Sequence, residues 1–193
     1  MQKDERKSLK VATANAETKT EAKSEIGGAR AFIGMGSNIE PRFESLRLAR
    51  NGLRMLGEHS KVSRVYETVP VGGVPQPDYL NAVMEVRTQY GPLELARYLK
   101  ALEIALGRRP RPKWHEREID LDLLFYDDVV LDTPELTLPH PELIRRAFVL
   151  VPMAELDPDF MHPVLHESIS SLLSNVDTRG IKRTMLNLND PKY

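Results

Sequence analysis

The order of hydrophobic periodicities between residues 30 and 131 constrains the fold more than any other feature of this chain. Apolar residues recur every three to four positions in amphipathic helices and every second position in half-buried strands. Segments of the two kinds follow one another in the order β-α-β-β-α-β-β, and further helices follow residue 140. The predicted strands are Ala31–Met35, Val62–Thr68, Leu80–Thr88, Ile119–Tyr126 and Val129–Leu131, and the predicted helices are Pro41–Leu56, Pro92–Leu106, Pro141–Leu156 and His166–Leu173.

This order predicts an α+β fold, namely a ferredoxin-like βαββαβ sandwich with a mainly antiparallel sheet and an added C-terminal hairpin and helices. The turn at Asp127-Asp128 is expected to pair Ile119–Tyr126 with Val129–Leu131 in that hairpin. The helix that follows is expected to break near Pro152, because proline lacks the amide hydrogen that a helix interior needs. Since this fold hosts many functions, the function has to be argued from individual side chains.

Composition divides the chain of 193 residues into three parts. Residues 1–28 contain no aromatic residue and few large aliphatic ones, so they cannot bury enough apolar surface to offset the entropy lost on ordering. We predict that residues 1–28 are a mobile tail, with a short fraying helix as the alternative. Residues 29–176 are predicted to form one domain, and residues 177–193 a C-terminal tail.

Several classes of protein are excluded by composition. The chain has no cysteine, which excludes disulfides, thiolate metal sites and a cysteine nucleophile. Its formal net charge is -1, which does not suit a polycation for binding nucleic acid. No apolar run approaches the ~18–20 residues that span a bilayer, and the N-terminus lacks the apolar segment of a secretory signal. We therefore expect a cytoplasmic monomer that acts on small molecules, without a membrane or nucleic acid partner.

Asp120 and Asp122 are the sharpest chemical feature of the sequence. Side chains at positions i and i+2 of a strand point to the same face, so the two carboxylates are expected side by side. Adjacent carboxylates repel each other, and a divalent cation removes this repulsion. Mg²⁺ suits such a pair because it binds oxygen ligands and completes its shell with water and substrate phosphates. The alternative is a solvated strand edge that carries two acids by chance.

Basic residues gather just before this pair of acids. Between Gly107 and Arg117 the chain has five cationic side chains and Trp114, its single tryptophan. Cations beside a carboxylate pair suit a polyphosphate that binds through Mg²⁺, and guanidinium groups bind phosphate through two hydrogen bonds. The alternative is a solvated loop in which the tryptophan is a partly buried anchor. The five cations are Arg108, Arg109, Arg111, Lys113 and Arg117.

Two further motifs are weaker. His140 lies between two prolines and is followed by Arg145 and Arg146, so it is a candidate phosphate ligand, although a lone histidine is more often structural. The run Gly34-Met35-Gly36-Ser37-Asn38 lies between a predicted strand and a predicted helix, but it fits neither the Walker loop nor the dinucleotide fingerprint. Any nucleotide must be held in another way, and Ser37 or Asn38 is expected to cap the helix.

Four stretches together resemble the 6-hydroxymethyl-7,8-dihydropterin pyrophosphokinase family. They occur in the order of the family and cover about residues 30–160. The specific signature lies in REIDLDLL, within the third stretch. The stretches are AFIGMGSNIEPR, YETVPVGGVPQPDYLNAV, LGRRPRPKWHEREIDLDLLFYDD and LTLPHPELIRRAFVLVPMAEL.

The resemblance implies transfer of the terminal diphosphate of ATP to the hydroxymethyl oxygen of the pterin, with release of AMP, in folate biosynthesis. It implies two Mg²⁺ ions on Asp120 and Asp122, which with Arg117 are the catalytic residues. The ATP-binding residues that it implies are Lys100, Glu103, Arg111, Lys113, Trp114, Leu123, Thr137, His140 and Arg146. The substrate-binding residues that it implies are Thr68, Val71, Tyr79, Asn81, Trp114 and Phe148.

Three departures from the family pattern concern single phosphate contacts. The family usually has Trp-Gly-Pro-Arg where this chain has Trp114-His115-Glu116-Arg117, and Pro110 and Glu135 replace residues that are often basic. A single-stranded RNA-binding module on the same sheet is the alternative from another class. It requires aromatic residues in the RNP pattern, which no predicted strand shows. An inactive homologue would lack the acid pair, which this chain keeps.

Overall fold

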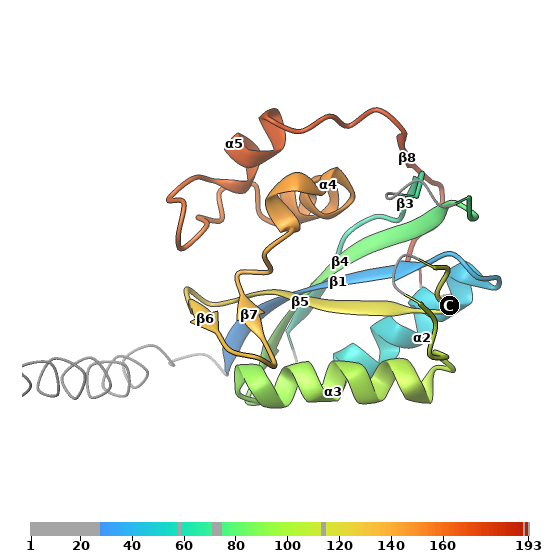
Figure 1. Ribbon diagram of the computed structural model, residues 1–193, viewed down its shortest axis with the longest axis horizontal. Helices are drawn as coiled ribbons and strands as arrows, with labels where there is room; N and C mark the ends of the chain where they lie inside the picture. Colours follow the sequence, from blue (N-terminus) through green and yellow to red (C-terminus); the bar gives the residue numbers. More distant parts are fainter. Residues whose placement is uncertain (1–27, 58, 71–74, 113–114, 191, 193) are drawn as a thin grey trace, which may run out of the picture.

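The computed structural model describes residues 28–57, 59–70, 75–112, 115–190 and 192. These residues form three layers, with a sheet between two pairs of helices (Figure 1). The helices α2 (Arg42–Arg54) and α3 (Pro92–Ala105) cover one face, and α4 (Ala147–Leu156) and α5 (Ile169–Ser174) lie over the other. The predicted tail at residues 1–28 lies outside the described residues except for Gly28.

The main sheet has the strand order β5-β1-β4-β3-β8, and β2 also pairs with β4. Every strand pair in it is antiparallel. With β1 and β4 in the centre and both first-layer helices on one face, this is the ferredoxin-like arrangement, which confirms the predicted α+β fold. The strands are β1 (Ala29–Ser37), β2 (Ser60–Val62), β3 (Tyr66–Thr68), β4 (Tyr79–Thr88), β5 (Asp120–Tyr126) and β8 (Ile181–Arg183).

Two hydrophobic cores hold the layers together. The larger one packs α2 and α3 against the sheet and includes Ile33, Leu99 and Leu121, all nearly or fully buried. The smaller one packs α4 and α5 against the other face and includes Phe32 and Leu124. β1 and β4 are covered on both faces, so almost every residue along them is buried or half-buried, the polar ones included.

The predicted strand Val62–Thr68 is in fact two short strands. Ser63 interrupts it, because its backbone N–H donates to the carbonyl of Val83 while its hydroxyl accepts from the N–H of Val83. β2 therefore pairs with the middle of β4, and β3 pairs with the first residues of β4. The break brings Thr68 beside Tyr79.

The predicted hairpin between Ile119–Tyr126 and Val129–Leu131 does not form. Leu131–Asp132 forms β6, which pairs with β7 (Thr137–Leu138) and not with β5. The outer edge of β5 is taken instead by His140, whose N–H donates to the carbonyl of Leu124. The expected break near Pro152 is also misplaced, because Pro152 lies inside α4. The break falls at Arg146, whose backbone is extended between a 3-10 turn and α4.

Residues beyond 176, which we expected to be a tail, contribute to the fold. β8 pairs with β3, and Leu188 is fully buried in the larger core. The carbonyl of Leu188 accepts a hydrogen bond from Arg50 of α2. The final short helix also begins later than predicted, at Ile169.

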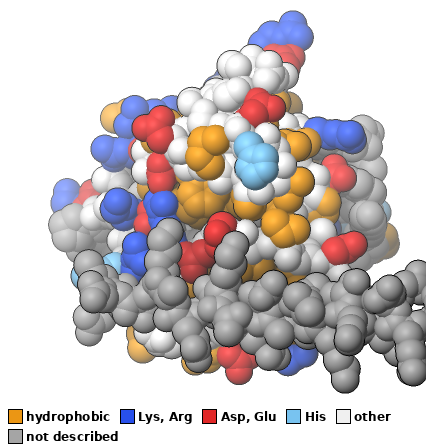
Figure 2. All heavy atoms as spheres, turned by 90° about the vertical axis from the view of Figure 1, so that its left-hand side faces the viewer, with side chains coloured by type: hydrophobic (Ala, Val, Ile, Leu, Met, Phe, Trp, Pro, Cys, Tyr) orange, Lys and Arg blue, Asp and Glu red, His pale blue; other side chains and the backbone are white. Residues whose placement is uncertain are grey.

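One end of the molecule, where β6 and α5 lie in Figure 1, presents hydrophobic side chains gathered among scattered charges (Figure 2). β5 ends near β6 at Tyr126 and begins at Asp120, so the acid pair lies toward the opposite end of the sheet. None of the helices in the described ranges is long and apolar enough to cross a membrane.

Candidate active site

The strand register brings Asp120 and Asp122 onto a polar part of the sheet face that α4 covers. Asp120 lies opposite Gly36 of β1, and Gly36 lies opposite Asn81 of β4. One step along the sheet, Asp122 lies opposite Gly34. The apolar core on this face therefore ends where glycines, an amide and two carboxylates replace large side chains.

Gly36 has a spatial requirement at this position. A Cβ atom built on Gly36 would lie 2.9 Å from the side-chain oxygen of Asn81. Glycine therefore allows the Asn81 amide to lie close above β1. The glycine run that resembled no known phosphate loop in the sequence thus forms part of a cavity floor.

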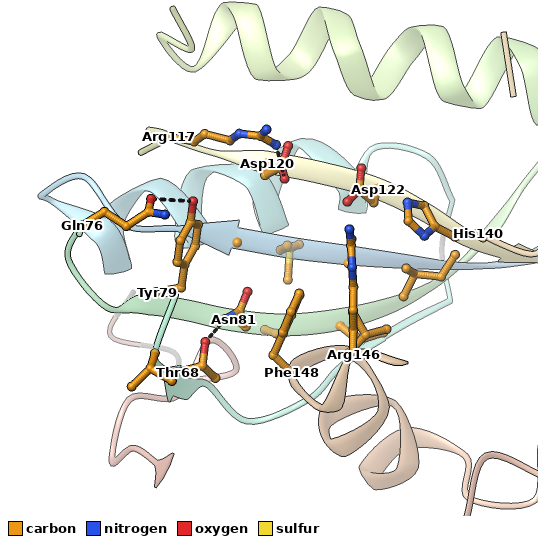
Figure 3. A pocket seen from close by; sticks show the side chains of 18 of the residues that line it. Thr68, Gln76, Tyr79, Asn81, Arg117, Asp120, Asp122, His140, Arg146 and Phe148 are labelled. Carbon is orange, nitrogen blue, oxygen red and sulfur yellow. Dashed lines mark hydrogen bonds and ion pairs between the residues drawn. The ribbon is translucent and has the colours of Figure 1, made fainter. Parts of the chain in front are cut away.

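A cavity of about 270 Å³ lies over this floor (Figure 3). Tyr79 and Phe148 give it aromatic walls, and Thr68 and Asn81 give it polar groups. The Asn81 amide nitrogen donates to the Thr68 hydroxyl at 2.7 Å, which leaves the amide oxygen toward Gly36. Burial raises the pKa of the Tyr79 phenol, so it stays protonated and donates to the Gln76 side chain at 3.4 Å. We call this space the first cavity.

A second cavity of about 630 Å³ lies between α3 and β7. Its walls include Lys100 of α3, Leu123 of β5 and Thr137 of β7. Asp122 and His140 line both cavities, so the two spaces meet at the second carboxylate.

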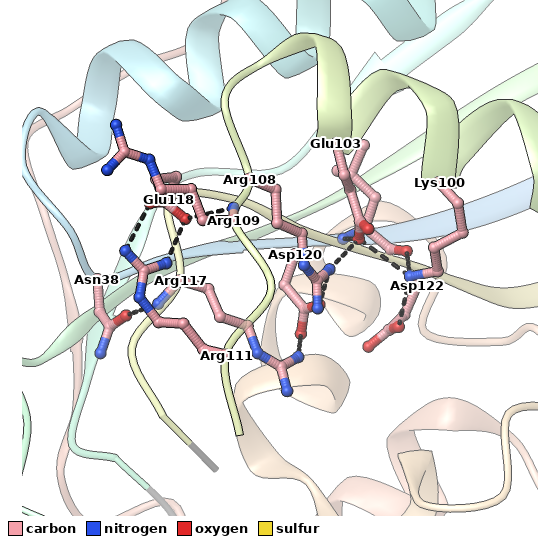
Figure 4. Close-up of polar contacts among 11 residues, drawn as sticks. Asn38, Lys100, Glu103, Arg108, Arg109, Arg111, Arg117, Glu118, Asp120 and Asp122 are labelled. Carbon is pink, nitrogen blue, oxygen red and sulfur yellow. Dashed lines mark hydrogen bonds and ion pairs between the residues drawn. The ribbon is translucent and has the colours of Figure 1, made fainter. Parts of the chain in front are cut away.

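Asp120 is paired with two arginines (Figure 4). Arg108 reaches one carboxylate oxygen at 2.7 Å, and Arg117 reaches the other at 2.6 Å. Asp122 has a weaker ionic environment, because Lys100 lies 4.0 Å from its nearer oxygen. The two carboxylates are therefore adjacent on β5 but differ in how fully cations neutralise them.

Glu103 is a buried carboxylate behind these pairs. Its side chain accepts from Lys100 at 3.0 Å, from Arg108 at 2.5 Å and from the N–H of Leu121 at 2.7 Å. Burial raises the pKa of Glu103, and Lys100 opposes that shift. Since Glu103 is only 2% exposed and lines neither cavity, it orients the two cations that flank the acid pair.

Two other described arginines of the basic loop, Arg111 and Arg117, are also held by specific contacts. Arg111 binds Glu118 through two hydrogen bonds of 2.6 and 2.7 Å, which lower the pKa of Glu118 to about 2. Arg117 is fixed through its backbone by Asn38, whose side-chain oxygen accepts from the Arg117 N–H at 2.7 Å. Arg111 therefore points to Glu118, whereas Arg117 points to Asp120.

His140 lies beside Asp122, at the outer edge of β5 (Figure 3). Burial lowers its pKa, so the ring is neutral near pH 7. Its Nδ1 accepts from the N–H of Glu142 at 3.3 Å, which leaves the proton on Nε2 for donation. Arg146 lies beside it, with its guanidinium 5.7 Å from the ring centre of Phe148.

The structure brings most of the predicted site residues together. Those that line the first cavity are Thr68, Tyr79, Asn81, Arg117, Asp120, Asp122, His140, Arg146 and Phe148. Those that line the second are Lys100, Asp122, Leu123, Thr137 and His140. Glu103 and Arg111 lie outside both cavities. Val71, Lys113 and Trp114 lie outside the described residues.

Three residues with roles in this geometry were missed from the sequence. Arg108 was recognised as one of five cations, but no spacing rule distinguishes it from Arg109, which is exposed. Asn38 was expected to cap a helix, but α2 has Pro41 at its N-cap position and no side-chain cap. Gln76 lies in a glycine- and proline-rich loop without periodicity, so no sequence signal singled it out.

The sequence pattern of the 7,8-dihydro-6-hydroxymethylpterin-pyrophosphokinase family matches residues 32–158. That span is more than half of the chain and includes both carboxylates and both cavities.

The chain belongs to this family.

Two curated pyrophosphokinases agree with this assignment. The 2-amino-4-hydroxy-6-hydroxymethyldihydropteridine pyrophosphokinase of Synechocystis is 39% identical over 153 residues, which are 78% of each chain. The enzyme of the same name from Aquifex aeolicus is 37% identical over 141 residues, which are 73% of this chain and 88% of that one. The expected family is thereby confirmed.

A solved structure of an HPPK-DHPS protein in complex with substrates has the same fold; HPPK is the abbreviation of the pyrophosphokinase family named above. It superposes with a TM-score of 0.63 at 14% identity and covers 82% of this chain. This chain spans 47% of that longer protein. The likeness supports the ferredoxin-like fold of the pyrophosphokinase.

Proposed function

We propose that the two cavities carry out the reaction of this family, the transfer of the diphosphate of ATP to the hydroxymethyl group of 6-hydroxymethyl-7,8-dihydropterin with release of AMP. In this proposal the pterin occupies the first cavity and the nucleotide occupies the second. The observation that carries it is that Asp122 and His140 line both cavities. The reacting groups of the two substrates would therefore meet beside the acid pair.

The first cavity suits a flat, polar heterocycle. Tyr79 and Phe148 offer aromatic surfaces for a ring, and the Asn81 oxygen is a hydrogen-bond acceptor for a ring N–H or amino group. Thr68 fixes the orientation of that amide. The second cavity is more than twice as large, with an apolar wall at Leu123 and a cation at Lys100, as a nucleoside with phosphates requires.

Asp120 and Asp122 fit Mg²⁺, and we propose that they hold two ions. Their donor atoms are all carboxylate oxygens, which Mg²⁺ prefers. Within the described ranges, no group of three or more His, Cys, Asp or Glu side chains could hold a metal ion. Phosphate and water would therefore supply the remaining ligands, as is usual for this ion. When bound, Mg²⁺ would neutralise charge on the triphosphate.

The side chains around the acids would position the triphosphate. Arg117 and Arg146 line the first cavity, and Lys100 lines the second, so cations approach the acid pair from different sides. Neutral His140 would donate from Nε2 to a phosphate oxygen. Catalysis of phosphoryl transfer consists mainly of such positioning and charge stabilisation. On the resemblance alone, we assign Lys113 to ATP binding, Trp114 to binding of both ATP and the pterin, and Val71 to pterin binding.

The bond changes are simple in this arrangement. The hydroxymethyl oxygen attacks the β-phosphorus, and the bond from that phosphorus to the α,β-bridging oxygen breaks. AMP leaves with the bridging oxygen, and the hydroxyl proton is released. The cations hold the three phosphates so that attacking and leaving oxygens lie in line.

A coupled assay tests the proposal. Purified protein, ATP, MgCl₂ and 6-hydroxymethyl-7,8-dihydropterin are expected to give AMP and pterin diphosphate in equal amounts, and EDTA is expected to stop the reaction. Asp122→Asn is expected to lose this activity, and Asp128→Asn, the same change at an exposed turn, is its matched control. AMP formation without pterin, or release of ADP instead of AMP, would contradict the proposal.

We also propose that the pyrophosphokinase acts as a cytoplasmic monomer. Sedimentation at micromolar concentration tests the monomer, and a dimer that dissociates only with loss of activity would contradict it.

A further inference from the structure

Asn38 connects the two halves of the candidate site although it lies in neither substrate cavity. It follows the last residue of β1, and it is 1% exposed. Its contacts reach the basic loop on one side and the loop before β4 on the other. The mechanism proposed above gives this buried amide no task.

On one side, Asn38 holds the backbone of Arg117. Its side-chain oxygen accepts from the Arg117 N–H at 2.7 Å, and its own N–H donates to the Arg117 carbonyl at 3.1 Å (Figure 4). Both polar groups of the Arg117 peptide backbone are therefore fixed by one residue. The Arg117 guanidinium is then directed to Asp120.

On the other side, Asn38 holds the loop that lines the first cavity. Its side-chain nitrogen donates to the side-chain oxygen of Gln76 at 3.0 Å and to the carbonyl of Pro77 at 3.1 Å. Gln76 lines the cavity, and the same oxygen also accepts from the hydroxyl of Tyr79 (Figure 3). A ligand that touches Gln76 is thus two hydrogen bonds away from the backbone of Arg117, and one that touches Tyr79 is three away.

Only a carboxamide can make both sets of contacts. The Arg117 N–H can only donate and the Pro77 carbonyl can only accept, which fixes the orientation of the amide. Aspartate at this position would keep the acceptor for Arg117 but would place an oxygen against the oxygens of Gln76 and Pro77. A helix-capping role does not account for the residue, since α2 has no side-chain cap.

We propose that Asn38 is a positioning residue that couples occupation of the first cavity to the placement of Arg117. When a pterin packs against Tyr79 and Gln76, the Asn38 amide transmits the ordering of that wall to the backbone of the arginine. The inference rests on the proposed function, in that the ligand of the first cavity is a pterin and Arg117 contacts phosphate.

Asn38→Asp is the informative variant, because it keeps the acceptor for the Arg117 N–H and removes the donor to Gln76 and Pro77. We expect kcat to fall by about 100-fold, the effect of a small misplacement of a catalytic group. KM for ATP should change by less than about 3-fold, since the residue does not touch the nucleotide. Asn51→Asp, the same change at an exposed position of α2, should leave both constants unchanged.

Amide hydrogen exchange supplies a readout that does not depend on turnover. In the wild type, 6-hydroxymethylpterin alone, without ATP or Mg²⁺, should slow exchange in a peptide covering residues 115–121. In Asn38→Asp the pterin should still slow exchange in residues 79–83, whereas the effect on 115–121 should be lost. The melting temperature shows whether a variant is folded, and Gln76→Ala, which breaks the link from the other side, should show the same loss of coupling.

Two results would overturn the inference. One is a pterin effect on residues 115–121 that persists in both variants or is absent from the wild type. The other is a fall in kcat that only parallels a fall in melting temperature. Failure of the proposed function would look different, because the wild type would then form no AMP while the exchange experiment could still show coupling.

Discussion

Asp120 and Asp122 are two positions apart on β5, yet removal of each should affect folding differently. Asp120 neutralises Arg108 and Arg117, so Asp120→Ala leaves two guanidinium groups facing each other. Asp122 has Lys100 at 4.0 Å, a longer distance that contributes little. The charges around each carboxylate, and not its position on the strand, therefore determine how much each substitution lowers the free energy of unfolding.

The first prediction concerns these two alanine variants. Each should lower turnover by about 1,000-fold, because the charge stabilisation that goes with the ion amounts to several kcal/mol. Asp120→Ala should also lower the free energy of unfolding by about 1 kcal/mol, and Asp122→Ala should leave it nearly unchanged. Urea unfolding and the AMP assay on the same preparations measure both effects. Equal stability of the two variants would contradict the ionic account.

The second prediction separates Arg108 from its neighbour Arg109. Arg108 binds both Glu103, which is buried, and Asp120, whereas Arg109 is exposed. Arg108→Ala should lower the free energy of unfolding by about 3 kcal/mol, because it removes a cation from a buried carboxylate. Arg109→Ala changes the net charge equally and should cost less than about 0.5 kcal/mol. Denaturant unfolding of the two variants tests this prediction. Similar losses of free energy of unfolding would show that the ion pairs of Arg108 contribute little to stability.

At the level of elements, long periodic segments were predictable and short pairings were not. α2, α3, β4 and β5 lie where their periodicity placed them, because each buries a regular apolar pattern. The β6–β7 pairing could not be read from the sequence, since two-residue strands carry no periodicity. The break of Val62–Thr68 depends on a hydroxyl that replaces a backbone group, which is a tertiary interaction.

The candidate site was also predictable from the sequence only in part. Asp120 and Asp122 could be placed on one face from their spacing alone, because strand geometry fixes that relation. Their partners could not, since Lys100 and Arg108 reach them from α3 and the loop after it, where Glu103 holds both cations. The family resemblance supplied the pterin-side residues, which pattern reasoning alone had not found.

The third prediction concerns the segment between α4 and α5. The Nδ1 atom of buried His162 accepts from the N–H groups of Val164 and Leu165, both at 3.2 Å, so protonation of that atom breaks both bonds. Burial lowers the pKa of His162 below the usual value of about 6.5 for histidine, although nearby Glu167 opposes that shift. The unfolded chain therefore binds this proton more readily than the folded chain does.

The direction in which stability depends on pH follows from this difference in proton affinity. The contribution of His162 to stability is complete above about pH 6.5 and is lost as the pH falls through the lower pKa of the folded protein. His162→Asn keeps an acceptor and removes the titration, so its free energy of unfolding should depend less steeply on pH between 8 and 5. Urea unfolding at several pH values measures this, and parallel curves for the two proteins would contradict it.

For the whole molecule, the final residues complete the larger core. Leu188 is fully buried, and its carbonyl accepts from Arg50 of α2. We predict that Leu188→Ala lowers the free energy of unfolding by about 3 kcal/mol, as the loss of a buried leucine side chain usually does. Met185→Ala, at a fully exposed position of the same segment, should have almost no effect. Thermal unfolding compares the two, and equal melting temperatures would show that the segment is not docked in solution.

Both edges of the main sheet are protected against the addition of a strand. At one edge the N–H of His140 bonds to the carbonyl of Leu124, and at the other β8 covers β3 with three residues, two of them exposed cations. Short, positively charged edge strands discourage the addition of a strand from another molecule. The segment that completes the core thus also acts against aggregation. A chain that ends at Gly180 would expose the backbone of β3 beside the first cavity, and self-association would then compete with folding.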